Sequence, residues 1–194
     1  MTSIPEGLAE LLADFATISD RTERAELLIE MADRFPEVKV APAVAVPPYD
    51  DRHRAPACES EAYVWATDRP DETLTYRFDV LNPQGLSAKA LAVIAGETLS
   101  GAPLEQVAAV PDDIVFQLFG RELTMGKGAG LMGILSLVRA EAKRRCSRLR
   151  ASRSRPCRRS ACSGEPTSPN EGWRPCRCRC SLGSARRTRQ PRVH

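Results

Sequence analysis

Cysteine is scarce over most of this chain. Of the seven cysteines among its 194 residues, only Cys58 precedes residue 146. A single cysteine cannot form an intramolecular disulfide, so the region up to residue 145 is neither a disulfide-stapled fold nor a two-cysteine oxidoreductase. Histidine is also rare, and His53 has no second histidine or further cysteine in that region with which to complete a usual zinc site. We therefore expect His53 to be a solvated loop residue.

Long apolar runs are absent as well. No stretch approaches the roughly 18 continuous apolar residues of a membrane-spanning helix. The first residues, Met-Thr-Ser-Ile-Pro-Glu, have neither the basic start nor the apolar run of a secretory signal. We expect no membrane partner and a cytoplasmic, reducing location in which a lone cysteine stays a thiol.

The net charge of +3 conceals two regions of opposite sign. Residues 1–145 hold 15 basic and 23 acidic residues, a net charge of −8, whereas residues 146–194 carry +11 from 13 arginines and two acids. Contacts to phosphate need a positive field, so nucleic acid is not expected as a partner of the acidic region. We expect one domain over residues 1–145.

Residues 146–194 read as a separate tail. They contain only three large aliphatic residues beside 13 Arg, eight Ser and five Pro, too little apolar surface to offset the entropy of ordering, so the tail is predicted to be disordered. The Cys-x-Cys-x-Cys run that begins at Cys176 has no partner pair at zinc-finger spacing. A frameshift product of a GC-rich gene and an Arg-rich nucleic-acid-binding tail are the two interpretations of this composition.

The remaining patterns predict an α+β fold. Apolar residues recur at spacings of three and four over residues 5–17, which predicts a helix, and a capping box of Asp20 and Glu23 opens a second helix that ends before Pro36. Later helices are predicted over these ranges: Ser87 to Leu99, 104–110, 112–119 and 131–145, the last after a glycine-containing connector. Because helices and strands are segregated along the chain, a parallel alternating sheet is not indicated.

Between the second and third helices the sequence changes character. Five prolines over residues 36–57 predict a long irregular connection. Residues 62–66 read as a strand, 68–71 as a turn, and 74–80 as a second strand in which apolar and polar residues alternate. We expect an antiparallel hairpin with one solvent-exposed face.

Cys58 lies between the proline-rich connection and the first strand, which predicts a thiol at a loop tip. A free cysteine often packs as a small hydrophobic residue, so a purely structural role is one alternative. The polar neighbours Glu59 and Ser60 favour an accessible thiol instead. Attack by this thiol would require its thiolate form.

The segment around Cys58 resembles the SufE family. Residues 56–65 read Pro-Ala-Cys-Glu-Ser-Glu-Ala-Tyr-Val-Trp, and in that family a cysteine, followed by serine two positions on and by a Trp-containing strand, carries sulfur as a persulfide. Cys58, Ser60 and Trp65 match the pattern. Ala57 stands where the family often has glycine, and Glu59 where it has glutamine.

A second segment far along the chain resembles the same family. Residues 123–131, Leu-Thr-Met-Gly-Lys-Gly-Ala-Gly-Leu, are similar to the Leu-Ser/Thr-Pro-x-Arg-x-x-Gly-Leu segment that opens its final helix. Met125 replaces the proline, and Lys127 replaces the arginine, which keeps the charge but loses the bidentate fork. The glycine-rich run lacks the spacing of a phosphate-binding loop. The resemblance spans about residues 5–143.

The resemblance implies a SufE-like fold and a specific function. It implies a sulfur acceptor and activator of a cysteine desulfurase, with Cys58 as the catalytic residue and Ser60, Trp65 and Lys127 as supporting residues. The implied partners are the desulfurase, which would hold pyridoxal phosphate, and an iron-sulfur scaffold protein; this chain would need no cofactor of its own. Whether such a transfer protein counts as an enzyme stays open. The alternative is a non-catalytic interaction domain of the same fold in which Cys58 is structural.

Overall fold

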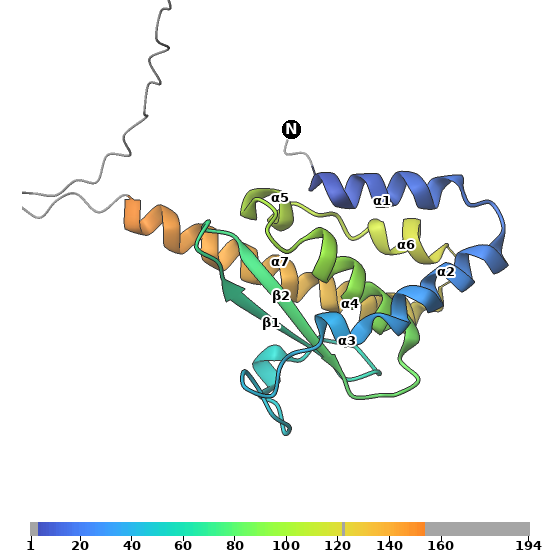
Figure 1. Cartoon of the computed structure of the whole chain (residues 1–194), viewed down its shortest axis with the longest axis horizontal. Helices are drawn as coiled ribbons and strands as arrows, with labels where there is room; N and C mark the ends of the chain where they lie inside the picture. Colours follow the sequence, from blue (N-terminus) through green and yellow to red (C-terminus); the bar gives the residue numbers. More distant parts are fainter. Residues whose placement is uncertain (1–3, 122, 154–194) are drawn as a thin grey trace, which may run out of the picture. The chain divides into compact units, whose positions relative to one another are not determined.

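A computed structural model describes residues 4–121 and 123–153. Its elements, in chain order, are α1 (Glu6–Thr17), α2 (Arg21–Asp33), α3 (Phe35–Val38), the 3-10 turn η1 (Asp51–His53), β1 (Ala62–Asp68), β2 (Leu74–Val80), α4 (Leu86–Thr98), α5 (Leu104–Ala108), α6 (Ile114–Phe119) and α7 (Met125–Arg153). The architecture is α+β, as predicted (Figure 1). The predicted tail beyond residue 153 lies outside the described residues, so its disorder stays a prediction.

Helix α4 lies at the centre of this fold. Every residue from Ala90 to Gly96 is buried, and the helix contacts α1, α2, α3, α7 and β2. A helix that is apolar on all sides belongs in a core rather than at a surface. The hairpin packs against α4 and α7 on one side of this core, and α1 and α2 contact α4 as well (Figure 1).

The hairpin has the predicted pairing, with Val64 opposite Phe78 in an antiparallel register. Successive side chains of a strand point to opposite faces. Val64 and Phe78 therefore join the helical core, whereas Tyr63 and Trp65 pack in a separate cluster on the outer face. The prediction of one solvent-exposed face was wrong, because this second cluster covers the outer face.

The covering comes from the proline-rich segment, which folds back over the hairpin. The ring of Tyr49 lies 5.0 Å from that of Tyr63 and 4.9 Å from that of Trp65, in edge-on geometry. Its hydroxyl donates to Asp79 Oδ2 at 2.6 Å, and Lys39 Nζ lies 3.4 Å from Asp79 Oδ1. Burial and the Asp79 carboxylate raise the pKa of Tyr49 to about 12, so the hydroxyl keeps its proton and remains a donor.

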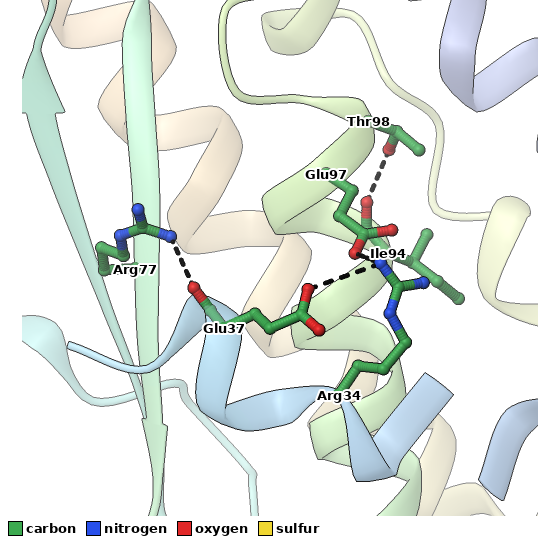
Figure 2. Close-up of polar contacts among 6 residues, drawn as sticks. All are labelled: Arg34, Glu37, Arg77, Ile94, Glu97 and Thr98. Atoms are coloured by element: carbon green, nitrogen blue, oxygen red, sulfur yellow. Dashed lines mark hydrogen bonds and ion pairs between the residues drawn. The ribbon is translucent and has the colours of Figure 1, made fainter. Parts of the chain in front are cut away.

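The same segment is more regular than its prolines predict. It begins with the short helix α3, in which Pro36 occupies the first turn, where a missing amide hydrogen costs nothing. Arg34 pairs with Glu97 of α4 and lies 3.5 Å from Glu37, and Arg77 of β2 donates to the Glu37 carbonyl at 3.1 Å (Figure 2). These contacts fix α3 to both α4 and β2.

Helix α7 is longer at both ends than predicted. Gly126 and Gly128 belong to its first turns rather than to a connector, and it continues through Arg153 instead of ending at Arg145. Cys146 and Leu149 are partly buried against the core, and this packing stabilises the added turns. No proline occurs between residues 125 and 153 to interrupt the helix. The start of the predicted tail, residues 146–153, is therefore helical.

Within the described ranges, no helix is both long and apolar enough to cross a membrane.

Candidate functional site

Cys58 lies in the loop between η1 and β1, as predicted, but its side chain is not at an exposed tip. Only 8% of the residue is accessible. Backbone hydrogen bonds close the loop on both sides, from Ala55 N to Ala62 O at 2.8 Å and from Glu61 N to Cys58 O at 3.1 Å. Helix α7 then covers the turn that these bonds form. The predicted exposed thiol is corrected to one held in a folded loop against a helix.

The loop and the helix meet through glycines. A Cβ atom on Gly133 would lie 2.1 Å from the carbonyl oxygen of Pro56, and one on Gly130 would lie 3.1 Å from Cys58 Cα. No side chain larger than hydrogen fits at Gly133 unless the loop or the helix moves. Gly130 belongs to the predicted family motif, whereas Gly133 was missed; only its spacing of three from Gly130 could have indicated a shared face.

Two non-glycine residues that flank the Cys58 turn have backbone angles in the left-handed region. Ala57 has φ of 57° and Glu61 has φ of 50°. This conformation costs an L-residue with a Cβ about 1–2 kcal/mol, whereas glycine adopts it freely. The turn that presents Cys58 is therefore strained at both ends.

Replacing Ala57 with glycine should relieve part of this strain. We expect Ala57→Gly to raise the free energy of unfolding by about 1 kcal/mol, reduced somewhat by the greater freedom of glycine in the unfolded chain. Urea denaturation followed by circular dichroism measures the change. Loss of stability would contradict the assigned conformation, and Ala55→Gly, at a buried position of the same loop, is the control expected to destabilise.

A recess with a volume of about 410 Å³ opens beside the thiol and is called the Cys58 recess below. Its lining includes Cys58, Glu59, Ser60, Asn82, Leu86, Gly126 and Lys127. Two of the predicted supporting residues, Ser60 and Lys127, therefore meet Cys58 at one site. The two sequence segments that carry the family resemblance come together there, although they lie far apart in the chain.

Trp65, the third predicted supporting residue, lies elsewhere. It is not among the described residues that line the Cys58 recess, because it sits on the outer face of β1. His53 stacks on it with ring centroids 5.2 Å apart and bonds through Nδ1 to Val64 O at 2.9 Å. His53 is thus a half-buried packing residue, and the expectation of a solvated histidine was wrong.

The charges around the recess are mixed. Lys127 is exposed at the rim, in the first turn of α7, where the amide groups of a helix start also favour negative charge. Glu59 also lines the recess, with Oε1 3.5 Å from the position of a Cβ on Gly126. Arg54 and Glu61 pair with each other at 3.4 Å, so their charges largely offset. Lys127 and the start of α7 thus favour negative charge in the recess, whereas the Glu59 carboxylate disfavours it.

The chemistry that this lining supports is limited. No histidine lies among the residues described as lining the recess, so no general base of that kind is at hand. Across the described ranges no group of three or more His, Cys, Asp or Glu residues could hold a metal ion. The nucleophile that the recess offers is the Cys58 thiol, with the Ser60 hydroxyl and the Lys127 ammonium in the same lining.

Comparison with known proteins identifies related sequences and folds. The family model SufE, described as an Fe-S metabolism associated domain, matches residues 9–142. A solution structure of a hypothetical protein from Thermus thermophilus matches with a TM-score of 0.54 and 23% identity, over 74% of this chain and 98% of that chain. At that identity the likeness establishes the fold alone. No curated protein matches the chain.

Proposed function

The chain belongs to the SufE family of domains associated with iron-sulfur metabolism, and on that premise we propose that Cys58 accepts sulfur from a cysteine desulfurase. The sulfur is carried as a persulfide and passed to an iron-sulfur scaffold protein. One observation supports this most: the two segments matching the family motifs converge on the Cys58 recess, which holds the thiol, Ser60 and Lys127.

The proposed transfer is a thiol-persulfide exchange. The Cys58 thiolate attacks the outer sulfur of a persulfide on the desulfurase, a new sulfur-sulfur bond forms, and the old one breaks. The bonding electrons leave with the desulfurase cysteine as its thiolate, so no external oxidant or reductant is needed. Pyridoxal phosphate belongs to the desulfurase in this scheme, and this chain contributes only its thiol.

Lys127 and Ser60 have supporting roles in the proposal. A persulfide is readily ionised, and the Lys127 ammonium together with the α7 start would favour its anionic form in the recess. Ser60, which lines the same recess, offers a hydroxyl donor. The Glu59 carboxylate disfavours the anionic persulfide, so stabilisation of that form depends on Lys127.

Removing the charge of Lys127 should slow the transfer. We expect Lys127→Gln to lower the single-turnover rate of sulfur transfer to Cys58 about tenfold, equivalent to about 1.4 kcal/mol, and Lys127→Arg to retain most of it. Rapid-quench experiments with persulfide-loaded desulfurase give the rate. Lys143→Gln, an exposed lysine farther along α7, is the control. Equal rates in all three variants would remove Lys127 from the mechanism.

The burial of Cys58 bears on how the transfer starts. With 8% of the residue accessible, the incoming sulfur approaches Cys58 through the recess, and movement of the loop would widen that approach. The left-handed backbone at Ala57 and Glu61 lowers the cost of that movement, because leaving the turn relieves strain. The thiol therefore stays protected until a partner docks. We place this chemistry in the cytoplasm, where thiols remain reduced.

The same burial favours one alternative function. Cys58 packs in the apolar core of the fold, as a structural cysteine would. The alternative is an interaction domain in which this residue only packs. The two differ in whether sulfur appears on Cys58, which the substitution and mass measurements in the Discussion test.

A further inference from the structure

A second recess, with a volume of about 660 Å³, opens where α1 and α2 meet the end of α6 (Figure 1). Four of its lining side chains are cationic: Arg21, Arg24, Arg121 and Lys127. Among the described residues of this lining none is acidic, whereas residues 1–145 as a whole carry a net charge of −8. This concentration of positive charge, called the Arg24 recess below, indicates an anionic ligand.

Arg24 is held in place by the ends of two helices. Its Nη1 donates to Gln117 O at 2.7 Å and to Leu118 O at 3.2 Å. Its Nη2 donates to Phe15 O at 2.8 Å and to Ile18 O at 2.9 Å. These carbonyl partners are neutral, so they fix the guanidinium without cancelling its charge. Because Arg24 is half-buried, that charge is screened less by salt than a fully exposed one.

The hydrogen-bond donors for a ligand come from other side chains of the lining. Arg121 and Lys127 are both exposed. A guanidinium matches the oxygens of a phosphate with paired N–H groups, and an ammonium adds a compact charge. Thr124 Oγ1 accepts from the Lys127 amide at 3.4 Å, which leaves its hydroxyl hydrogen to donate to a ligand. These groups are the donors that a phosphate oxygen requires.

The recess also has an apolar part. Phe116, Phe119 and Leu123 line it and are half-buried. Small-molecule sites have volumes of about 300–1,000 Å³ and combine apolar walls with a few polar groups, so this recess has room for more than a free phosphate ion. The phenylalanine and leucine side chains would contact the carbon portion of an organic ligand.

We propose that the Arg24 recess binds a small organic phosphate monoester. Arg121, Lys127 and Thr124 bind the phosphate, Arg24 supplies a fixed positive charge, and the apolar side chains contact the organic group. Lys127 also lines the Cys58 recess, so a bound phosphate withdraws its charge from a persulfide there. The ligand therefore slows sulfur transfer, and this second part rests on the proposed function.

Calorimetric titration of the full chain with phenyl phosphate, at fixed ionic strength, tests the site. Arg121→Gln combined with Lys127→Gln should raise the dissociation constant at least about tenfold, because hydrogen bonds to charged groups are the stronger ones. Lys143→Gln combined with Arg148→Gln is the matched control and should bind like the wild type, because both residues are exposed on α7 outside this lining. The Arg-rich tail is the same in both double variants, so its contribution cancels.

Two partial ligands test the chemical class. Phenol lacks the phosphate and inorganic phosphate lacks the ring, so each should bind at least about tenfold more weakly than phenyl phosphate. If the two double variants bind phenyl phosphate alike, the Arg24 recess is not the site. If inorganic phosphate binds as tightly as phenyl phosphate, the organic ligand is overturned.

The effect on sulfur transfer is measured separately, at a phenyl phosphate concentration that saturates the wild type. The single-turnover rate should fall at least about threefold, part of the roughly tenfold loss expected for Lys127→Gln. Arg121→Gln, with its weakened binding, should keep its rate, which excludes an effect on the desulfurase. An unchanged rate in the saturated wild type would overturn the coupling. If phenyl phosphate binds as expected but no sulfur reaches Cys58, the anion site stands and the proposed function falls.

Discussion

Replacing Cys58 with alanine should eliminate sulfur acceptance and desulfurase stimulation together. Cys58 supplies the only thiol among the residues described as lining the recess, so no other group there can take up the outer sulfur of a persulfide. We expect transfer to fall at least about a hundredfold, while stability changes by about 1 kcal/mol, as expected for removing one buried sulfur atom. Sulfide release by the desulfurase, with cysteine as substrate, reports the loss.

Cys146 provides the matched control for that result. It is the other free cysteine in the described ranges, and burial with the nearby Glu105 carboxylate raises the pKa of its thiol. It is therefore mostly protonated and unreactive near neutral pH. Cys146→Ala should retain full stimulation. Retained stimulation in Cys58→Ala with reduced stability would instead support the alternative of a packing cysteine in an interaction domain.

Adding one methyl group at Gly133 should displace the loop that holds Cys58. Its Cβ would lie 2.1 Å from Pro56 O, so the Cys58 loop must be displaced from α7. Such overpacking costs about 1–3 kcal/mol, more than the roughly 1 kcal/mol that alanine gains over glycine in a helix. We expect Gly133→Ala to lower the unfolding midpoint, to speed alkylation of Cys58, and to slow sulfur transfer about tenfold.

Gly128 is the control for Gly133, because it lies in the same helix and a Cβ there has no neighbour within 4 Å. Gly128→Ala should stabilise the protein by up to about 1 kcal/mol through helix propensity and leave Cys58 alkylation unchanged. If Gly133→Ala behaves in the same way, the glycine contact between loop and helix is not what holds Cys58.

Local patterns in the sequence were enough for the elements that form from local interactions. The helix predicted over 5–17 is observed as α1 from Glu6 to Thr17, and the strand over 74–80 coincides with β2. Periodicity reports which face of an element is buried. It does not report what covers that face. The Tyr49 contacts over the hairpin and the Arg34 pairing that fixes α3 join distant residues, so both escaped prediction.

Only part of the candidate site was predicted, because contacts between distant residues determine the rest. The order of motifs led to Cys58, Ser60 and Lys127, which the fold brings together around one recess. Trp65 was expected with them because it belongs to the same family-like segment as Cys58, but strand alternation turns it to the outer face. The burial of Cys58 depends on its contact with α7, which no local pattern around the cysteine contains.

The central claim is that sulfur resides on Cys58, and intact-mass measurement tests it most directly. The full chain is incubated with a desulfurase and cysteine, and its peptides are then mapped, since the tail carries other cysteines. The account predicts an addition of about 32 Da, one sulfur atom, on the peptide that contains Cys58, and none on that peptide in Cys58→Ala. An unmodified Cys58 peptide beside a desulfurase that binds and turns over would contradict it.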